Sequence, residues 1–407
     1  MTLPPARRRA PEAPSPPAGA HLPALDGVRG VAILLVLLLH FTVYGGPPPS
    51  ALPDRIFHEL AAAGWVGVDL FFVLSGFLIT GILYDAKGSR RYFRNFYARR
   101  VLRIFPLYYG SLLIFLVLLP ALFPEHAGLQ SLRRDGPWYW AYLSNVLVAR
   151  EGWPEFGALG HFWSLAVEEQ FYLLWPVVVL LCSRRTLMVL CLTLVAASFA
   201  LRVGLGLAGR ETAAFVLTPA RIDALAAGGL LALAARGPHG LRPLSRWARP
   251  AAAASAVALA SLFVWRRGLP AEDFVVSTVG YTLLACLFAA LVLLALTSPP
   301  QAALGRLFAS SGLVFFGRYS YGLYVFHHPL LFLKPQALSY GALPTVLGSR
   351  LPGLLLFLLA ATAVSAAAAF LSWHLYEKQF LKLKERFPYE RRRAAPAAID
   401  VEQVPAP

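Results

Sequence analysis

LDGVRGVAILLVLLLHF (residues 25–41) decides the fold, because it reads as one apolar helix of membrane-crossing length that nevertheless carries charge. Arg29 and His40 lie eleven residues apart. At ~100° and ~1.5 Å per residue they fall within about 20° of one face and about 16 Å apart along the axis. An ionisable side chain inside hydrocarbon is costly and is by default a functional-site hypothesis that needs a partner. The two residues therefore point to chemistry within a membrane.

Composition supports the membrane setting, since 57% of residues are apolar, 14% are charged and the mean hydropathy is +0.59. We expect an all-α polytopic membrane protein, a bundle of about ten transmembrane helices. The short stretch 250–265 and the aromatic segment 138–147, which is too brief to cross, leave nine and eleven helices open. The ten stretches are 28–44, 64–84, 102–123, 165–182, 186–208, 214–235, 250–265, 274–297, 313–333 and 351–376.

Lys and Arg cluster in alternate loops, as the positive-inside rule requires when both termini are cytoplasmic. Residues 87–103 and 236–249 belong to the basic loops, whereas Arg133 and Arg134 on the opposite side are accompanied by Asp135. This asymmetry accounts for the net charge of +16. The chain shows no groove-reading or base-stacking module, so we expect the lipid bilayer rather than nucleic acid as its partner.

The domain organisation follows from composition. Residues 1–21 are rich in Pro, Ala and Arg and cannot bury a core, so we expect a disordered cytoplasmic tail. They are not a signal peptide, because no small-residue cleavage site follows the apolar run. Residues 22–380 form the transmembrane domain, and 381–407 a second cytoplasmic tail with no appended soluble domain. The three cysteines have no metal-ligand spacing, so we expect neither a disulfide nor a metal.

Polar residues gather at two levels of the expected bundle. Asp69, His161, Glu168 and Glu169 lie near the outer helix ends, at the depth that His40 reaches. A histidine near a carboxylate is the usual general-base arrangement, because the carboxylate fixes the tautomer and stabilises the imidazolium. Further polar residues at this level are Arg221, Asp223, His327 and His328.

The cytoplasmic level is dominated by the basic segment 87–106. Arg100 and Arg103 are three residues apart and project from one helix face, where they could clamp a phosphate. The alternative is that this is only the strongest topogenic loop, whose basic side chains reach anionic headgroups.

The chain resembles the acyltransferase-3 family of integral-membrane O-acyltransferases. The patterns appear in order over about residues 22–380: LDGVRGVAILLVLLLHF, GVDLFFVLSGFLIT, RRVLRIFPLYY, HFWSLAVEEQFYLLWP, RID-A-A-G at 221–228 and GRYSYGLYVFHHPL (317–330). The resemblance implies transfer of an acyl group, commonly acetyl from acetyl-CoA, to a hydroxyl of a sugar or glycan. It also implies a multi-pass protein of a bacterial-type inner membrane, with no permanently bound cofactor.

Carried over to this chain, the family's Arg-x10-His pattern falls on Arg29 and His40, its Arg-x-x-Arg pattern on Arg100 and Arg103, and its fourth-helix carboxylate on Glu168. The resemblance makes His40 the general base, with Glu168 and Asp69 as supporting carboxylates. Arg29, Arg100 and Arg103 would hold the donor. An acyl-histidine intermediate remains the competing mechanism. The candidate acceptor-binding residues are His161, Tyr321, Tyr324, His327, Arg221 and Asp223.

Two alternatives come from other functional classes. A bundle with buried His, Asp, Glu and Arg is also typical of a transporter, although no internal repeat supports that interpretation. The protein could also be a subunit that relays acyl groups to a separate transferase. The acceptor is open among envelope glycans and small secreted metabolites such as macrolides.

Overall fold

The computed structural model describes residues 23–43, 51–154, 156–332, 342 and 345–389. The described part consists of helices with one isolated β-bridge, between Val346 and Ser349, and contains no strand. The tail expected at 1–21 lies outside it, as do residues 390–407 of the second tail.

Nine helical runs in the described residues are long and apolar enough to cross a membrane, which confirms an all-α membrane bundle. The α-helices are α1 Pro23–Val43, α2 Leu52–Ala62, α3 Val66–Asp85, α4 Tyr92–Leu113, α5 Leu119–Leu122, α6 Ala127–Arg134, α7 Gly136–Trp140, α8 Ser144–Glu151, α9 Trp163–Leu181, α10 Arg184–Leu207, α11 Glu211–Val216, α12 Thr218–Ala235, α13 Arg242–Arg266, α14 Tyr281–Thr297, α15 Ala303–Phe308, α16 Ser311–Arg318, α17 Ser320–Phe332, α18 Leu351–Ser372 and α19 Lys378–Lys382.

The ninth expected span, 313–333, is divided into α16 and α17. Tyr319 ends α16 with a backbone conformation of φ −97° and ψ 8°. The break falls beside Arg318, but the apolar residues on both sides of it made the stretch read as one span. α16 packs antiparallel to the first half of α1, and α17 then runs back toward the level of His40.

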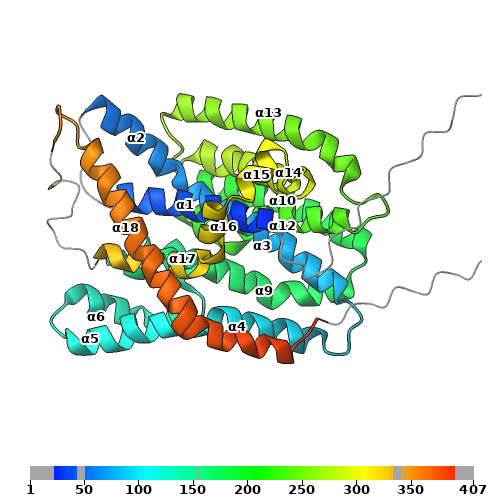
Figure 1. Cartoon of the computed structure of the whole chain (residues 1–407), viewed down its shortest axis with the longest axis horizontal. Coiled ribbons are helices and arrows are strands. Elements are labelled where there is room, and N and C mark those ends of the chain that lie inside the picture. Colours follow the sequence, from blue (N-terminus) through cyan, green and yellow to red (C-terminus); the bar gives the residue numbers. More distant parts are fainter. Residues whose placement is uncertain (1–22, 44–50, 155, 333–341, 343–344, 390–407) are drawn as a thin grey trace, which may run out of the picture.

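Glycines let α1 lie in the interior of the bundle, against α3 and α16 (Figure 1). A Cβ added at Gly30 would lie 2.1 Å from the carbonyl oxygen of Leu313 in α16. A Cβ at Gly67 of α3 would lie 2.4 Å from the carbonyl oxygen of Ala32. Small residues allow such close backbone approach between membrane helices. These close contacts fix the position of α1 along its axis and its rotation about that axis, and therefore the positions of Arg29 and His40.

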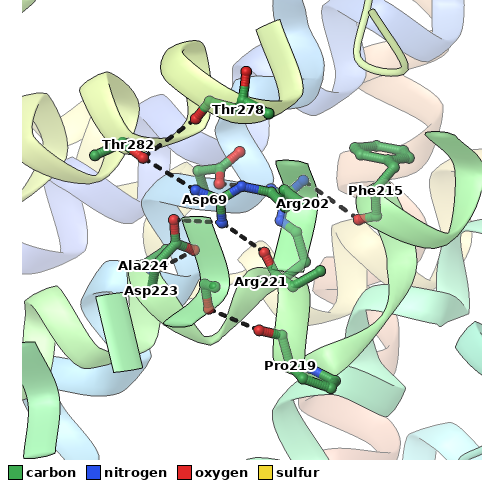
Figure 2. A network of polar contacts seen from close by, with 11 residues as sticks. Asp69, Arg202, Phe215, Pro219, Arg221, Asp223, Ala224, Thr278 and Thr282 are labelled. Carbon is green, nitrogen blue, oxygen red and sulfur yellow. Dashed lines mark hydrogen bonds and ion pairs between the residues drawn. The ribbon is translucent and has the colours of Figure 1, made fainter. Parts of the chain in front are cut away.

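Two buried ion pairs join α3, α10 and α12 (Figure 2). Asp69 accepts from Arg221 at 2.5 Å, and Asp223 lies 2.7 Å from Arg202. All four residues are at most 1% exposed. The guanidinium of Arg221 also lies over the ring of Tyr281, 4.1 Å from its centroid. Charges removed from solvent in this way are tolerated only when they are paired and hydrogen-bonded.

The C-terminal end of the helical chain lies along α4 (Figure 1). Arg99 donates to the carbonyl oxygens of Lys384 and Phe387 at 2.9 and 3.1 Å, and Asn95 donates to that of Pro388 at 2.7 Å. The helical part therefore continues to Arg386, beyond the boundary expected at 380, because α4 supplies donors to its last carbonyl groups. This contact fixes Lys384 beside the arginines of α4.

Candidate active site

Four cations surround a cavity of about 290 Å³, which we call the arginine cavity. Arg29 comes from α1, Arg100 and Arg103 from α4, and Lys384 from the C-terminal segment. The family resemblance grouped the first three as donor-binding, and they line one cavity. Such a concentration of guanidinium groups suits phosphate, because each can donate two parallel hydrogen bonds to its oxygens.

The cations are held by aromatic rings as well as by charge. Arg103 lies over Trp373 and Tyr321, 5.2 and 5.8 Å from the ring centroids, and Arg100 lies 5.9 Å from that of Tyr172. Arg29 is paired with Asp26 at 2.7 Å. The Nε of Arg100 is buried without a hydrogen-bond partner. A buried donor of this kind is costly unless a ligand accepts from it.

Glu168 lies in the arginine cavity rather than beside His40. Its Oε1 accepts from Ser75 at 2.6 Å, and the hydroxyl of Tyr172 donates to Ser75 at 3.1 Å. This differs from the expectation that Glu168 orients His40. The physical reason is helix geometry, since Glu168 is seven residues, or about 10 Å, along the chain from His161, which does lie beside His40.

His40 lies in a cluster of four histidines. Its ring centroid is 4.6 Å from that of His328, 4.8 Å from that of His327 and 6.5 Å from that of His161. The described residues contain no group of three or more His, Cys, Asp or Glu side chains arranged to hold a metal ion. Imidazole side chains can take up and release protons near neutral pH.

Backbone carbonyls assign the tautomers of this cluster. The Nδ1 of His40 lies 2.8 Å from the carbonyl oxygen of Val36, and that of His327 lies 2.8 Å from the carbonyl oxygen of Tyr324. A carbonyl oxygen only accepts, so both Nδ1 atoms carry the proton. The lone pair of each neutral ring is then on Nε2. A histidine held in this tautomer can take a proton at Nε2 without a carboxylate neighbour.

A second cavity of about 430 Å³, which we call the histidine cavity, contains His40, His161 and His328 in its wall. His161 is 4% exposed, and both of its ring nitrogens are buried without a hydrogen-bond partner. A neutral imidazole has one donor and one acceptor to satisfy. The two ring nitrogens of His161, whose ring centroid lies 6.5 Å from that of His40, are therefore unused polar atoms beside this cavity.

The two cavities meet at Val68 and Tyr324, which line both of them. The hydroxyl of Tyr324 donates to the carbonyl oxygen of His161 at 2.8 Å and lies 2.5 Å from the hydroxyl of Ser164. Ser164 faces the arginine cavity. One phenol thus forms the partition between a cationic cavity and a histidine-lined one.

The structure places several other candidates away from His40. Asp69, Arg221 and Asp223 form the buried ion pairs of Figure 2 and line neither cavity. Tyr321, expected to bind the acceptor, lines the arginine cavity and donates to the carbonyl oxygen of Ile104 at 2.7 Å. Their partners come from other helices, and pairing between helices is not readable from one sequence.

Sequence reasoning also missed residues that the structure brings to the cavities. His327, and not His328, was a candidate for binding the acceptor, yet His328 lines the histidine cavity, whereas His327 packs behind His40. Ser75 and Tyr172, which hold Glu168, and Lys384 also went unassigned. The adjacent His327 and His328 pair was the one available signal, because two ionisable residues in an apolar segment are rarely both incidental.

Comparison with known proteins places this geometry in a family. The model of an acyltransferase domain, the acyltransferase-3 family, matches residues 22–374. A putative peptidoglycan O-acetyltransferase YrhL of Bacillus subtilis is 35% identical over 164 residues, which are 38% of this chain and 23% of the relative. The O-acetyltransferase OatA of Staphylococcus aureus is 24% identical over 344 residues, 80% of this chain and 53% of the relative.

The chain spans about half the length, or less, of these curated relatives. No solved structure matches it significantly. The family match covers both cavities, with Arg29, His40, Arg100, Arg103 and the histidine cluster inside it and Lys384 outside it. The chain belongs to the acyltransferase-3 family of membrane acyltransferases.

Proposed function

We propose that the protein is a membrane O-acyltransferase that moves an acyl group, acetyl in the first instance, from acyl-CoA to a hydroxyl of a sugar or glycan. One observation carries the proposal: a cation-lined cavity and a histidine-lined cavity meet at Tyr324 and Val68. The first suits the phosphates of CoA, and the second supplies a base for a hydroxyl. Relatives named as peptidoglycan O-acetyltransferases support the reaction class.

The reaction follows from the assigned tautomer. Nε2 of His40 takes the proton of the acceptor hydroxyl while its oxygen attacks the thioester carbonyl. The tetrahedral intermediate collapses, the C–S bond breaks, and the CoA thiolate leaves and takes the proton from the His40 imidazolium. The base is thereby regenerated without an acyl-enzyme. An acyl-histidine would instead leave label on the protein when acyl-CoA is supplied without acceptor.

The proposal also includes a direction of transfer. By the positive-inside rule we expect the arginine cavity at the cytoplasmic side, where acyl-CoA is made, and the histidine cavity toward the outer side of a bacterial-type inner membrane. Arg29 and His40 are about 16 Å apart along one helix, comparable to an extended pantetheine arm. A single acyl-CoA could therefore reach from one cavity to the other.

The test is transfer from radiolabelled acetyl-CoA by the purified protein in nanodiscs, measured as CoA release and as label on a panel of glycans. We expect His40→Gln to lower turnover by about 10²–10⁴-fold, the usual contribution of a general base. His374→Gln is the matched control, because His374 makes the same contact to the carbonyl four residues before it and lines neither cavity.

Turnover that survives His40→Gln would remove His40 from the mechanism. A wild-type protein that binds CoA but releases none would support the relay-subunit alternative. A protein that does not bind CoA at all would contradict the acyltransferase proposal and favour the transporter interpretation.

A further inference from the structure

The two cavities carry opposite charge. The described lining of the arginine cavity holds four cations and one carboxylate, whereas that of the histidine cavity holds two carboxylates, Glu59 and Glu272, and no Lys or Arg. Glu59 belongs to α2, and Glu272 belongs to the connection between α13 and α14. The histidine cavity is therefore unfavourable for an anion, since like charges brought together suppress binding.

The segment that carries Glu272 is held in place by three hydrogen bonds. The indole of Trp65 donates to the carbonyl oxygen of Leu269 at 2.8 Å, and the phenol of Tyr281 to that of Ala271 at 2.5 Å. The indole of Trp153 donates to Oε1 of Glu272 at 2.9 Å. Two of these bonds hold the backbone before Glu272, and the third orients its carboxylate toward Trp153.

Trp153 presents a fixed aromatic surface beside these carboxylates. Its side chain is 42% exposed, yet its indole nitrogen is bound to Glu272 and its ring packs against Phe215 with centroids 6.0 Å apart. An exposed but immobilised indole is the usual surface for stacking the apolar face of a sugar ring. The carboxylates beside it can accept hydrogen bonds from sugar hydroxyls or amines.

We infer that the histidine cavity is a carbohydrate site selective for uncharged or amino-bearing sugars, in which Trp153 stacks a ring and Glu59 and Glu272 exclude acidic ones. His161, with two unsatisfied ring nitrogens, binds the hydroxyl presented to His40. This inference rests on the proposed function, because it names the acceptor class of the same site. It also explains why the anionic donor enters the other cavity.

The test measures binding without any acyl donor, so that it does not depend on turnover. Three fluorescently labelled tetrasaccharides are titrated onto the protein in nanodiscs: N-acetylglucosamine (neutral), glucosamine (cationic) and galacturonate (acidic). We expect the first two to bind at least about tenfold more tightly than the third. Equal or tighter binding of the galacturonate oligomer, or no binding of any of the three, would overturn the inference.

The double variant Glu59→Gln with Glu272→Gln assigns the selectivity to charge. Gln at position 272 keeps an oxygen that accepts from Trp153, so the variant removes charge and preserves the contact. We expect it to reduce the preference to within about threefold. Glu125→Gln is the control, because Glu125 is exposed and lines neither cavity. A preference unchanged in the double variant would refute the role of the carboxylates.

Trp153→Ala tests the stacking surface, with Trp247→Ala on α13, where the tryptophan is 60% exposed and lines neither cavity, as the control. We expect the first to weaken binding of the neutral oligomer about tenfold or more and the second to leave it unchanged. Unaltered binding in Trp153→Ala would refute the stacking role. If these binding effects occur and no acyl transfer is found, the carbohydrate site stands and the proposed function fails, so the two results are separable.

Discussion

Nδ1 of His40 lies 3.3 Å from Nε2 of His327, and Nδ1 of each ring donates a hydrogen bond to a backbone carbonyl oxygen. Since Nδ1 of His40 carries the proton, it donates in both directions, to the Val36 carbonyl and to the Nε2 lone pair of His327. His327 does not line the histidine cavity. It therefore acts on the acceptor only through His40, as a positioning residue for the base.

His327→Gln should consequently lower kcat while leaving KM for acetyl-CoA unchanged. The expected loss is about tenfold, far less than that for His40→Gln, because the Val36 carbonyl still holds the tautomer. Steady-state kinetics in nanodiscs measure both constants. A parallel change of kcat and KM, or a loss as large as that of His40→Gln, would contradict the positioning role.

The arginine cavity yields a prediction for the donor. Lys384→Gln and Arg103→Gln should each weaken CoA binding by about 10-fold or more, because each removes a charge-assisted hydrogen bond to phosphate. Lys382→Gln is the matched control, because Lys382 is only two residues before Lys384 in the chain. Its side chain is exposed and donates a hydrogen bond to Gln379. Isothermal titration with CoA and with dephospho-CoA gives the measurement.

If Lys384 binds the 3′-phosphate, wild type should prefer CoA over dephospho-CoA and Lys384→Gln should lose that preference. Equal weakening for both ligands would assign Lys384 to the pyrophosphate. No effect in either titration would exclude Lys384 from the donor site.

The sequence predicted the helices and the arginines for simple physical reasons. Membrane-spanning length, an Arg-x-x-Arg spacing on one helix face and the cost of charge in hydrocarbon are all local properties. These properties singled out Arg29 and the Arg100–Arg103 pair, but only the family resemblance grouped all three as donor-binding; one cavity contains them.

What depends on contacts between helices could not be predicted in the same way. Glu168 and Tyr321 lie in the arginine cavity because of the relative depth and rotation of their helices, which a single sequence does not encode in any local pattern. Trp153 and Glu272 lie in connecting segments without periodicity. Lys384 follows the last apolar stretch, where composition indicated only a tail.

Close packing around α1 gives a prediction about folding. Gly30→Leu should prevent assembly of α1 with α16, because a Cβ there would already lie 2.1 Å from the Leu313 carbonyl oxygen. Gly312→Leu, on α16 itself, should be tolerated, since a Cβ at Gly312 meets nothing within 4 Å. Yield of monodisperse protein after detergent extraction compares the two. A well-folded Gly30→Leu protein would show that α1 and α16 can separate.

The pair formed by Asp69 and Arg221 separates a structural role from a catalytic one. Asp69→Asn should destabilise the fold by about 3–5 kcal/mol, because it leaves the buried guanidinium of Arg221 uncompensated. Asp135→Asn is the control: its partner Arg134 is 79% exposed and lies 3.6 Å away, and such a surface pair contributes about 0–1 kcal/mol. Asp69→Leu combined with Arg221→Met should recover most of the stability, since it removes both buried charges.

Thermal melting in detergent measures stability, and CoA release per folded molecule measures activity. We expect the double variant to retain activity, because neither residue lines a cavity. A stable double variant without turnover would instead return Asp69 to the catalytic residues.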